Sequence, residues 1–240
     1  MRKAIVINGS PQAEKGNTAR ILAPFIEGME AGGAQVELFH AGRLEIKPCS
    51  GELHCWYEEP GLCIHPDGMQ ALYPLLRQAE TLVLATPVYI PLPGEMQNFL
   101  NRLCPLLEPV LETRDGRTRA RFHSDVAITR IALVVTSGWW EVGNCDTVVR
   151  IAREIAADAG VEFAGALLRP HVHLIWKRGE PTKEGQAVLE AVRKAGQELI
   201  KSGAMSRETL SAVGQPLCGQ EEYLQASNRS YRKAAGEAAE

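Results

Sequence analysis

Five short apolar runs, separated from one another by longer amphipathic segments, constrain the fold of this 240-residue chain more than any other feature. The runs cover residues 3–8, 35–40, 81–87, 127–138 and 161–170. They are rich in Val, Ile, Leu and Ala, as expected for strands that are buried on both faces of a parallel sheet. Strands of this kind alternating with helices predict a doubly wound α/β sandwich.

The segments between the runs carry apolar residues at helical spacing. Helices are expected in the second half of 9–33, over 67–79 with Asp67 as the cap, over 93–111 until prolines interrupt it, and over 144–160 and 182–203. We therefore assign residues 1–203 to one domain. Residues 204–240 form a more polar C-terminal tail, expected either to pack on a neighbouring subunit or to fray.

Charge and hydropathy exclude several classes of partner. A formal net charge of −3 and a pI near 6.1 give no reason to expect binding to nucleic acid or to a membrane surface. The first apolar run is too short for the core of a signal peptide. We therefore expect a cytoplasmic protein whose cysteines stay reduced.

The segment NGSPQAEKGNTA (8–19), after the first predicted strand, has the chemistry of a phosphate-binding loop. Ser10 and Thr18 offer hydroxyl donors, and Asn17 offers an amide donor. The loop runs into a helix whose first N–H groups attract an anion. It matches neither the dinucleotide fingerprint nor the lysine-bearing P-loop. The alternative is an ordinary strand–helix connector with capping residues.

Two further strand ends would meet this loop at the same edge of the sheet. The segment 85–102 begins at the end of the third strand. It is expected to be rigid and apolar, and it presents Tyr89. The segment 136–144 after the fourth strand combines small residues with Trp139 and Trp140. A ligand with a phosphate tail and a large planar head fits this combination.

The segments GSPQAEKGNTARIL (9–22) and ATPVYIPLPGEMQNFLNR (85–102) resemble the NAD(P)H-dependent FMN reductase family of flavodoxin-like flavoproteins, near its iron–sulfur flavoprotein branch. The resemblance covers roughly residues 1–200. It implies a five-stranded flavodoxin-like sheet of order 2-1-3-4-5, bound FMN, and a homodimer or homotetramer. The family often has Lys and Asp where this chain has Gln97 and Asn101.

The resemblance also implies which residues bind the cofactor. The FMN phosphate would be held by four residues of the first loop: Ser10, Gln12, Asn17 and Thr18. The isoalloxazine ring would be lined by residues after the third and fourth strands: Pro87, Val88, Tyr89, Thr136, Ser137 and Gly138. Backbone N–H groups of Ser137–Trp139 are candidates for stabilising the reduced ring.

The implied activity is a hydride transfer from NADPH or NADH to bound FMN, followed by electron transfer to a small-molecule acceptor. Quinones, nitro or azo compounds and free flavin are acceptors of the expected kind. The flavin would carry the chemistry, so no side chain is assigned a catalytic role. The alternatives are an FMN electron carrier or a metal- or cluster-containing flavoprotein working with a protein partner, and a scaffold with a degenerate site.

The segment CSGELHCWYEEPGLC (49–63) places three cysteines in one loop. The iron–sulfur branch has a fourth, at the position that Glu52 occupies here, and a standard cluster needs four thiolates. We expect Cys49, Cys55 and Cys63 to be structural or incidental thiols and assign no metal ligand. A redox-active or substrate-facing thiol and a metal or cluster site are the alternatives. Cys104, Cys145 and Cys218 show no pattern.

Three other groups of residues have two interpretations each. The arginines of 112–125 indicate either a solvated loop, which we favour, or a dock for the NADPH 2′-phosphate or an acidic partner. His171 and His173 are expected to be structural rather than a metal pair or substrate contacts. Trp139 and Trp140 would either contact the flavin or substrate or pack at the rim of the site.

Overall fold

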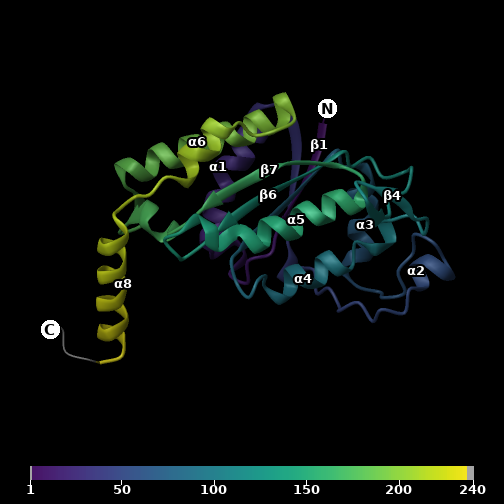
Figure 1. Ribbon diagram of the computed structural model, residues 1–240, viewed down its shortest axis with the longest axis horizontal. Helices are drawn as coiled ribbons and strands as arrows, with labels where there is room; N and C mark the ends of the chain where they lie inside the picture. Colours follow the sequence, from purple (N-terminus) through teal and green to yellow (C-terminus); the bar gives the residue numbers. More distant parts are fainter. Residues whose placement is uncertain (1, 237–240) are drawn as a thin grey trace.

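The five apolar runs form one parallel sheet in the computed structural model, which describes residues 2–236 (Figure 1). Its strands are β1 (Arg2–Asn8), β2 (Ala34–His40), β3 (Thr81–Pro87), β6 (Arg130–Thr136) and β7 (Glu162–Arg169). They lie in the order β2-β1-β3-β6-β7. Since β6 and β7 are the fourth and fifth strands of this sheet, the predicted flavodoxin-like order 2-1-3-4-5 is confirmed.

Helices cover both faces of the sheet, as doubly wound folds require. One face packs against α1 (Asn17–Ala31), α6 (Lys183–Ser202) and α7 (Arg207–Gly214). The other face packs against α3 (Gly68–Gln78), α4 (Gly94–Asn101) and α5 (Asp146–Ala159). Because the strands are buried on both sides, the apolar core is divided by the sheet into two halves.

The helices α1 and α6 cross at a point where glycine is required on both. A Cβ atom on Gly28 would collide with the carbonyl of Arg193, and one on Gly196 would collide with the carbonyl of Phe25. The two backbones therefore approach closely, and the second half of α1 is fixed against α6.

The C-terminal tail contains two helices with different surroundings. The helix α7 packs on β7 and buries Thr209 and Val213. The helix α8 (Gln220–Ala234) projects from the body of the protein (Figure 1), and Tyr223 is its buried residue. The helical tail is thus present, whereas the division into 1–203 and 204–240 stays a prediction. Residues 237–240 of that tail lie outside the described part.

Several boundaries differ from the predicted ones. The helix expected over 93–111 ends at Asn101, and a short 3₁₀ turn, Cys104–Leu106, follows it, because Pro105 cannot continue an α-helix. The fourth strand is shorter at both ends than 127–138. The arginine-rich stretch forms a hairpin of β4 (Glu112–Arg114) and β5 (Arg117–Arg119).

The remaining elements are short. They are α2 (His54–Tyr57), the strands β8 (Trp176–Lys177) and β9 (Glu180–Pro181), and the 3₁₀ turns Ala13–Lys15, Ala41–Arg43, Val142–Cys145 and Val172–Ile175. Within residues 2–236, no helix is both long and apolar enough to cross a bilayer.

Candidate functional site

The loop after β1 is held by the side chain of Asn8, the buried last residue of that strand. Its Oδ1 atom accepts a hydrogen bond from Ser10 N at 2.9 Å, and its Nδ2 atom donates to Ala13 O at 3.2 Å. The Ser10 hydroxyl oxygen accepts from Gln12 N at 3.3 Å. Asn8 thereby shapes the first half of the predicted phosphate loop.

The second half of this loop leads into α1, whose N-terminus has no capping side chain and no acidic residue in its first turn. The first backbone bond in this helix is donated by Arg20 N to Gly16 O at 3.3 Å, so the N–H groups of residues 17–19 precede it. At Gly16, a Cβ atom would lie 2.8 Å from the Ser10 Oγ atom and would fill the loop. An uncapped helix start with a positive end dipole is a site suited to an anion.

The four predicted phosphate residues fall into two groups. Gln12 and Asn17 are exposed on the loop, whereas Ser10 and Thr18 are buried. The Thr18 Oγ1 atom lies 2.8 Å from Thr136 Oγ1, at the end of β6. Thr18 therefore braces the loop after β1 against the fourth strand of the sheet, a contact that the sequence pattern did not indicate.

The loops after β3 and β6 lie side by side at the carboxyl edge of the sheet. Val88 N donates to Thr136 O at 2.9 Å, which joins the two loops directly. Tyr89 and Trp139 are both exposed, by 52% and 59%, so each presents most of an aromatic face to a ligand. The structure thus brings together the predicted residues of all three loops, while their contacts to a cofactor stay predictions.

The backbone donors expected in Ser137–Trp139 are mostly engaged. Ser137 N donates to Arg169 O at 2.9 Å, and Trp139 N donates to the Ser137 hydroxyl at 3.0 Å. Among these three residues, Gly138 N has no hydrogen-bond partner within the described chain. One donor of the three is therefore available to a ligand, fewer than the sequence suggested.

Comparison with known proteins places this chain in a family. The family model for NADPH-dependent FMN reductase matches residues 2–128, which include the loops after β1 and β3. The chain belongs to the NADPH-dependent FMN reductase family. The match ends before β6, so the loop at 136–139 is assigned to the site by the fold alone.

Relatives of this FMN reductase family member include an iron-sulfur flavoprotein of Archaeoglobus fulgidus, 32% identical over 104 residues, or 43% of this chain and 46% of the relative. An iron-sulfur flavoprotein of Methanocaldococcus jannaschii is 31% identical over 128 residues, or 52% of this chain and 61% of the relative. The matched region thus spans about half the length of these curated relatives.

Solved structures that share the fold have low sequence identity. An NAD(P)H:quinone oxidoreductase from Methanothermobacter marburgensis matches with a TM-score of 0.57 and 15% identity, over 83% of this chain and 98% of the other. An FMN-dependent NADH-azoreductase from Bacillus anthracis matches with a TM-score of 0.55 and 12% identity, over 85% and 100%. These similarities support the flavodoxin-like fold.

The residues of this candidate site fit the cofactor that the family name implies. The uncapped, acid-free start of α1 suits a phosphate, and the exposed rings of Tyr89 and Trp139 suit a planar head group. Both features lie at the carboxyl edge of the sheet, where the chain leaves β1 and β3 towards helices on opposite faces, α1 and α4. FMN has both chemical parts.

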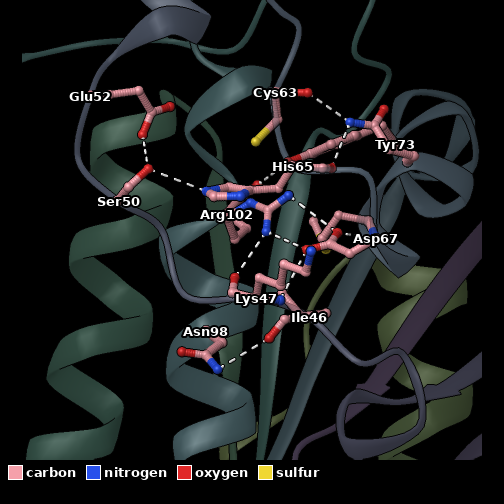
Figure 2. Close-up of polar contacts among 12 residues, drawn as sticks. Ile46, Lys47, Ser50, Glu52, Cys63, His65, Asp67, Tyr73, Asn98 and Arg102 are labelled. Atoms are coloured by element: carbon pink, nitrogen blue, oxygen red, sulfur yellow. Dashed lines mark hydrogen bonds and ion pairs between the residues drawn. The ribbon is translucent and has the colours of Figure 1, made fainter.

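The cysteine loop lies between β2 and α3 and is fastened by a buried ion pair (Figure 2). Arg102 donates to Asp67 at 2.7 and 3.2 Å and to Lys47 O at 2.9 Å. Asp67 also caps α3, as predicted, by accepting from Met69 N at 3.0 Å. Burial alone would raise the pKa of Asp67, but Arg102 and two backbone donors hold that pKa below its usual range.

The cysteines of this loop do not converge on a metal site in the structure. The Cys55 Sγ atom lies 3.7 Å from the Cys104 Sγ atom, and Glu52 is bound to Ser50. Among residues 2–236, no three His, Cys, Asp or Glu side chains lie close enough together to hold a metal ion. As placed, these residues do not fit an iron–sulfur cluster. The sequence missed the Cys55–Cys104 contact because 49 positions separate the two residues.

We expect the Cys55 and Cys104 thiols to react slowly with N-ethylmaleimide in the native protein, and the exposed Cys49 to react first. Burial raises the pKa of Cys55, and it raises the pKa of Cys104 to about 12, which leaves little thiolate at neutral pH. The labelling rate at Cys104, followed by peptide mass spectrometry, should be at least ~10-fold below that at Cys49.

Labelling in urea is the control, because unfolding should equalise the three rates. Faster native labelling of Cys55 or Cys104 than of Cys49 would contradict the structural role of these thiols and favour a redox-active pair.

The arginines of the hairpin are engaged with acids of this chain. Arg117 and Arg119 form ion pairs with Glu154 at 3.1 and 2.7 Å, and Arg121 pairs with Glu108 at 2.7 Å. These contacts favour the solvated-loop interpretation over a dock for a 2′-phosphate.

The first of the two histidines after β7 belongs to a buried hydrogen-bond network. His171 is buried and accepts at Nε2 from Arg169 at 2.7 Å and from Leu217 N at 3.1 Å. Burial lowers the pKa of His171 to about 4, so it stays neutral and acts as an acceptor. Arg169, also buried, donates to Val213 O at 2.6 Å and Gln215 O at 3.0 Å. The pair thus fastens the C-terminal segment to the edge of the sheet.

Proposed function

We propose that this chain is an FMN-dependent oxidoreductase that accepts electrons from NADPH or NADH and passes them to a small-molecule acceptor. The observation that carries the proposal is the uncapped N-terminus of α1 at the β1/β3 edge, within the region that the family model matches. When bound, FMN supplies reversible two-electron transfer at its ring. Two relatives that are named iron-sulfur flavoproteins also support a flavin-dependent function.

The residues of the chain would bind and orient the cofactor. The N–H groups of residues 17–19 and the Asn17 amide would hold the phosphate, and Gln12 would contact it from the loop. The buried residues Ser10 and Thr18 would contribute hydroxyl groups to the phosphate from the interior side of the loop.

The ring would lie among the residues at the ends of β3 and β6 and directly after them, which are Pro87, Val88, Tyr89, Thr136, Ser137 and Gly138. The Val88–Thr136 backbone bond fixes the distance between these loops before a ligand arrives. The Gly138 N–H would supply a donor to the ring, where negative charge develops on reduction. The homodimer or homotetramer and the cytoplasmic location expected from the sequence stay predictions.

The visible spectrum of freshly purified, anaerobic protein tests the proposal. We expect a flavin spectrum that bleaches within seconds of NADPH or NADH addition and returns when a quinone is added. Free FMN at the same concentration, without protein, is the control for direct reaction. A spectrum that both nucleotides leave unchanged would contradict the reductase and support an electron carrier. A protein that takes up no FMN would overturn both.

A further inference from the structure

A cavity of about 710 Å³ lies beside the candidate flavin loops and has no role in the function proposed above. It is lined by the loop after β6, the 3₁₀ turn Val172–Ile175 and the first turn of α6, with α8 as its outer wall. This volume falls within the range of ~300–1,000 Å³ that is typical of small-molecule sites. We propose that the cavity binds a planar aromatic molecule without negative charge and that it is the electron-acceptor site, which rests on the proposed oxidoreductase function.

Aromatic side chains form opposite parts of the lining. Trp139 contributes from the loop after β6, and Tyr223 and Tyr231 contribute from α8. Between the two tyrosines, the lining face of α8 carries only small side chains: Ala226, Ser227 and Ser230. The helix thus presents two rings separated by a recess. Trp139 and Tyr231 remain 59% and 67% exposed, so their faces are available for stacking on a flat ligand.

The charge of the lining selects against anions. Glu184 and Glu222 both line the cavity, and no lysine or arginine is among its lining residues. Burial lowers the pKa of His173, the one histidine of the lining, so it adds no positive charge at neutral pH. A phosphate or sulfonate would face two carboxylates without a counter-charge. NADPH, which carries several phosphate charges, is therefore excluded as the occupant, and an uncharged or cationic aromatic compound is favoured.

The cavity borders the candidate flavin site at Gly138 and Trp139. Gly138 belongs to the predicted ring-binding set, and it also lines the cavity together with Trp139. The Tyr223 hydroxyl donates to Gly138 O, which ties α8 to the same loop. A ligand in the cavity would therefore lie next to the loop expected to border the isoalloxazine ring.

The outer wall is held in place by two buried residues, Arg169 and His171. Arg169 binds the carbonyls of Val213 and Gln215, and His171 accepts from Leu217 N, immediately before α8. His171 N also donates to Trp139 O at 2.7 Å. One network thus positions both α8 and Trp139, the two sides of the cavity.

For a quinone acceptor the overall reaction is balanced with NADPH as reductant. NADPH, one proton and a quinone give NADP⁺ and a hydroquinone, so two electrons and two protons reach the two quinone oxygens. The added proton comes from solvent, and no further reductant is needed.

Binding can be tested with two probes that share one ring system and do not alkylate thiols. These are 2-(hydroxymethyl)anthraquinone, which is neutral, and anthraquinone-2-sulfonate, which is anionic. We expect the neutral probe to quench tryptophan fluorescence with a Kd at least ~10-fold below that of the sulfonate, a difference of ~1.4 kcal/mol. Glu222→Gln should reduce the difference in Kd between the two probes, and Trp139→Phe should reduce the quenching amplitude. Glu221→Gln, a neighbouring acid outside the lining, is the matched control and should resemble wild type.

Equal affinity for the two probes, no binding of either, or wild-type behaviour of both cavity variants would overturn the proposal. The titration requires no nicotinamide, so its outcome can be read even if the protein fails to oxidise NADPH. In turnover, Glu222→Gln should lower the KM for the sulfonate and leave the KM for NADPH unchanged. A changed KM for NADPH instead would mean that the cavity receives the nucleotide, and would also overturn the proposal.

Discussion

Asp67→Asn is expected to lower the free energy of unfolding by about 3–5 kcal/mol, the usual cost of leaving one member of a buried ion pair without its partner. The side chains of Arg102 and Asp67 are 1% and 3% exposed. Asparagine keeps the shape of the side chain and can still cap α3. The loss therefore measures the uncompensated charge of Arg102 rather than a damaged helix end. Urea unfolding followed by circular dichroism gives the free energy.

An exposed ion pair provides the matched control. Asp125 pairs with Arg77, but its side chain is 65% exposed, and Asp125→Asn should therefore cost less than ~1 kcal/mol. The double variant Asp67→Asn, Arg102→Met removes the stranded charge and should recover part of the stability. A loss of under ~1 kcal/mol for Asp67→Asn would show that the pair does not hold the cysteine loop.

The same pair predicts a pH dependence with a definite sign. The pKa of Asp67 is lower in the folded protein than in the unfolded chain, so the unfolded state takes up a proton first as the pH falls. The stability from this carboxylate is present above the unfolded pKa and is lost as the pH falls through the folded pKa. Asp67→Asn should lack this contribution, so its stability should fall less steeply below about pH 4.

The sequence predicted the layers of this fold because their signals are local. Continuous apolar runs marked all five strands of the sheet, and Asp67 before an amphipathic segment marked a capped helix. The loop at 8–19 could be recognised for the same reason, since its donors and the helix start lie within twelve residues.

The contacts that were missed join distant parts of the chain. Arg102 lies 35 positions from Asp67, and Thr18 lies 118 positions from Thr136. Such pairs leave no periodic pattern in the sequence, because the role of each side chain depends on a partner that only the folded chain brings close to it. Arg169 is the clearest case: it occurs in a strand, is wholly buried, and finds its carbonyl partners in the polar tail. The acceptor cavity depends on that tail, so its location could not follow from the flavin motifs alone.

Asn17→Asp is expected to have opposite effects on the apo protein and on FMN binding. An aspartate in the first turn of α1 interacts favourably with the helix dipole and should stabilise the apo protein by about 0.3–1 kcal/mol. The same carboxylate would repel a phosphate and remove an amide donor. FMN affinity should therefore fall at least ~100-fold, or ~2.7 kcal/mol. Thermal unfolding of apo protein and fluorescence titration with FMN give the two quantities.

Two further variants separate charge from the loss of a donor. Asn17→Ala removes the amide without adding charge, so its affinity loss should be smaller than that of Asn17→Asp, about 1.5 kcal/mol. Asn101→Asp makes the same chemical change at the exposed end of α4, remote from the start of α1, and should leave FMN affinity unchanged. If Asn17→Asp stabilised the apo protein but bound FMN as wild type does, the phosphate could not lie at the start of α1. The binding site would then have to be sought elsewhere along the carboxyl edge, because the helix dipole would have been tested directly and found without effect on the ligand.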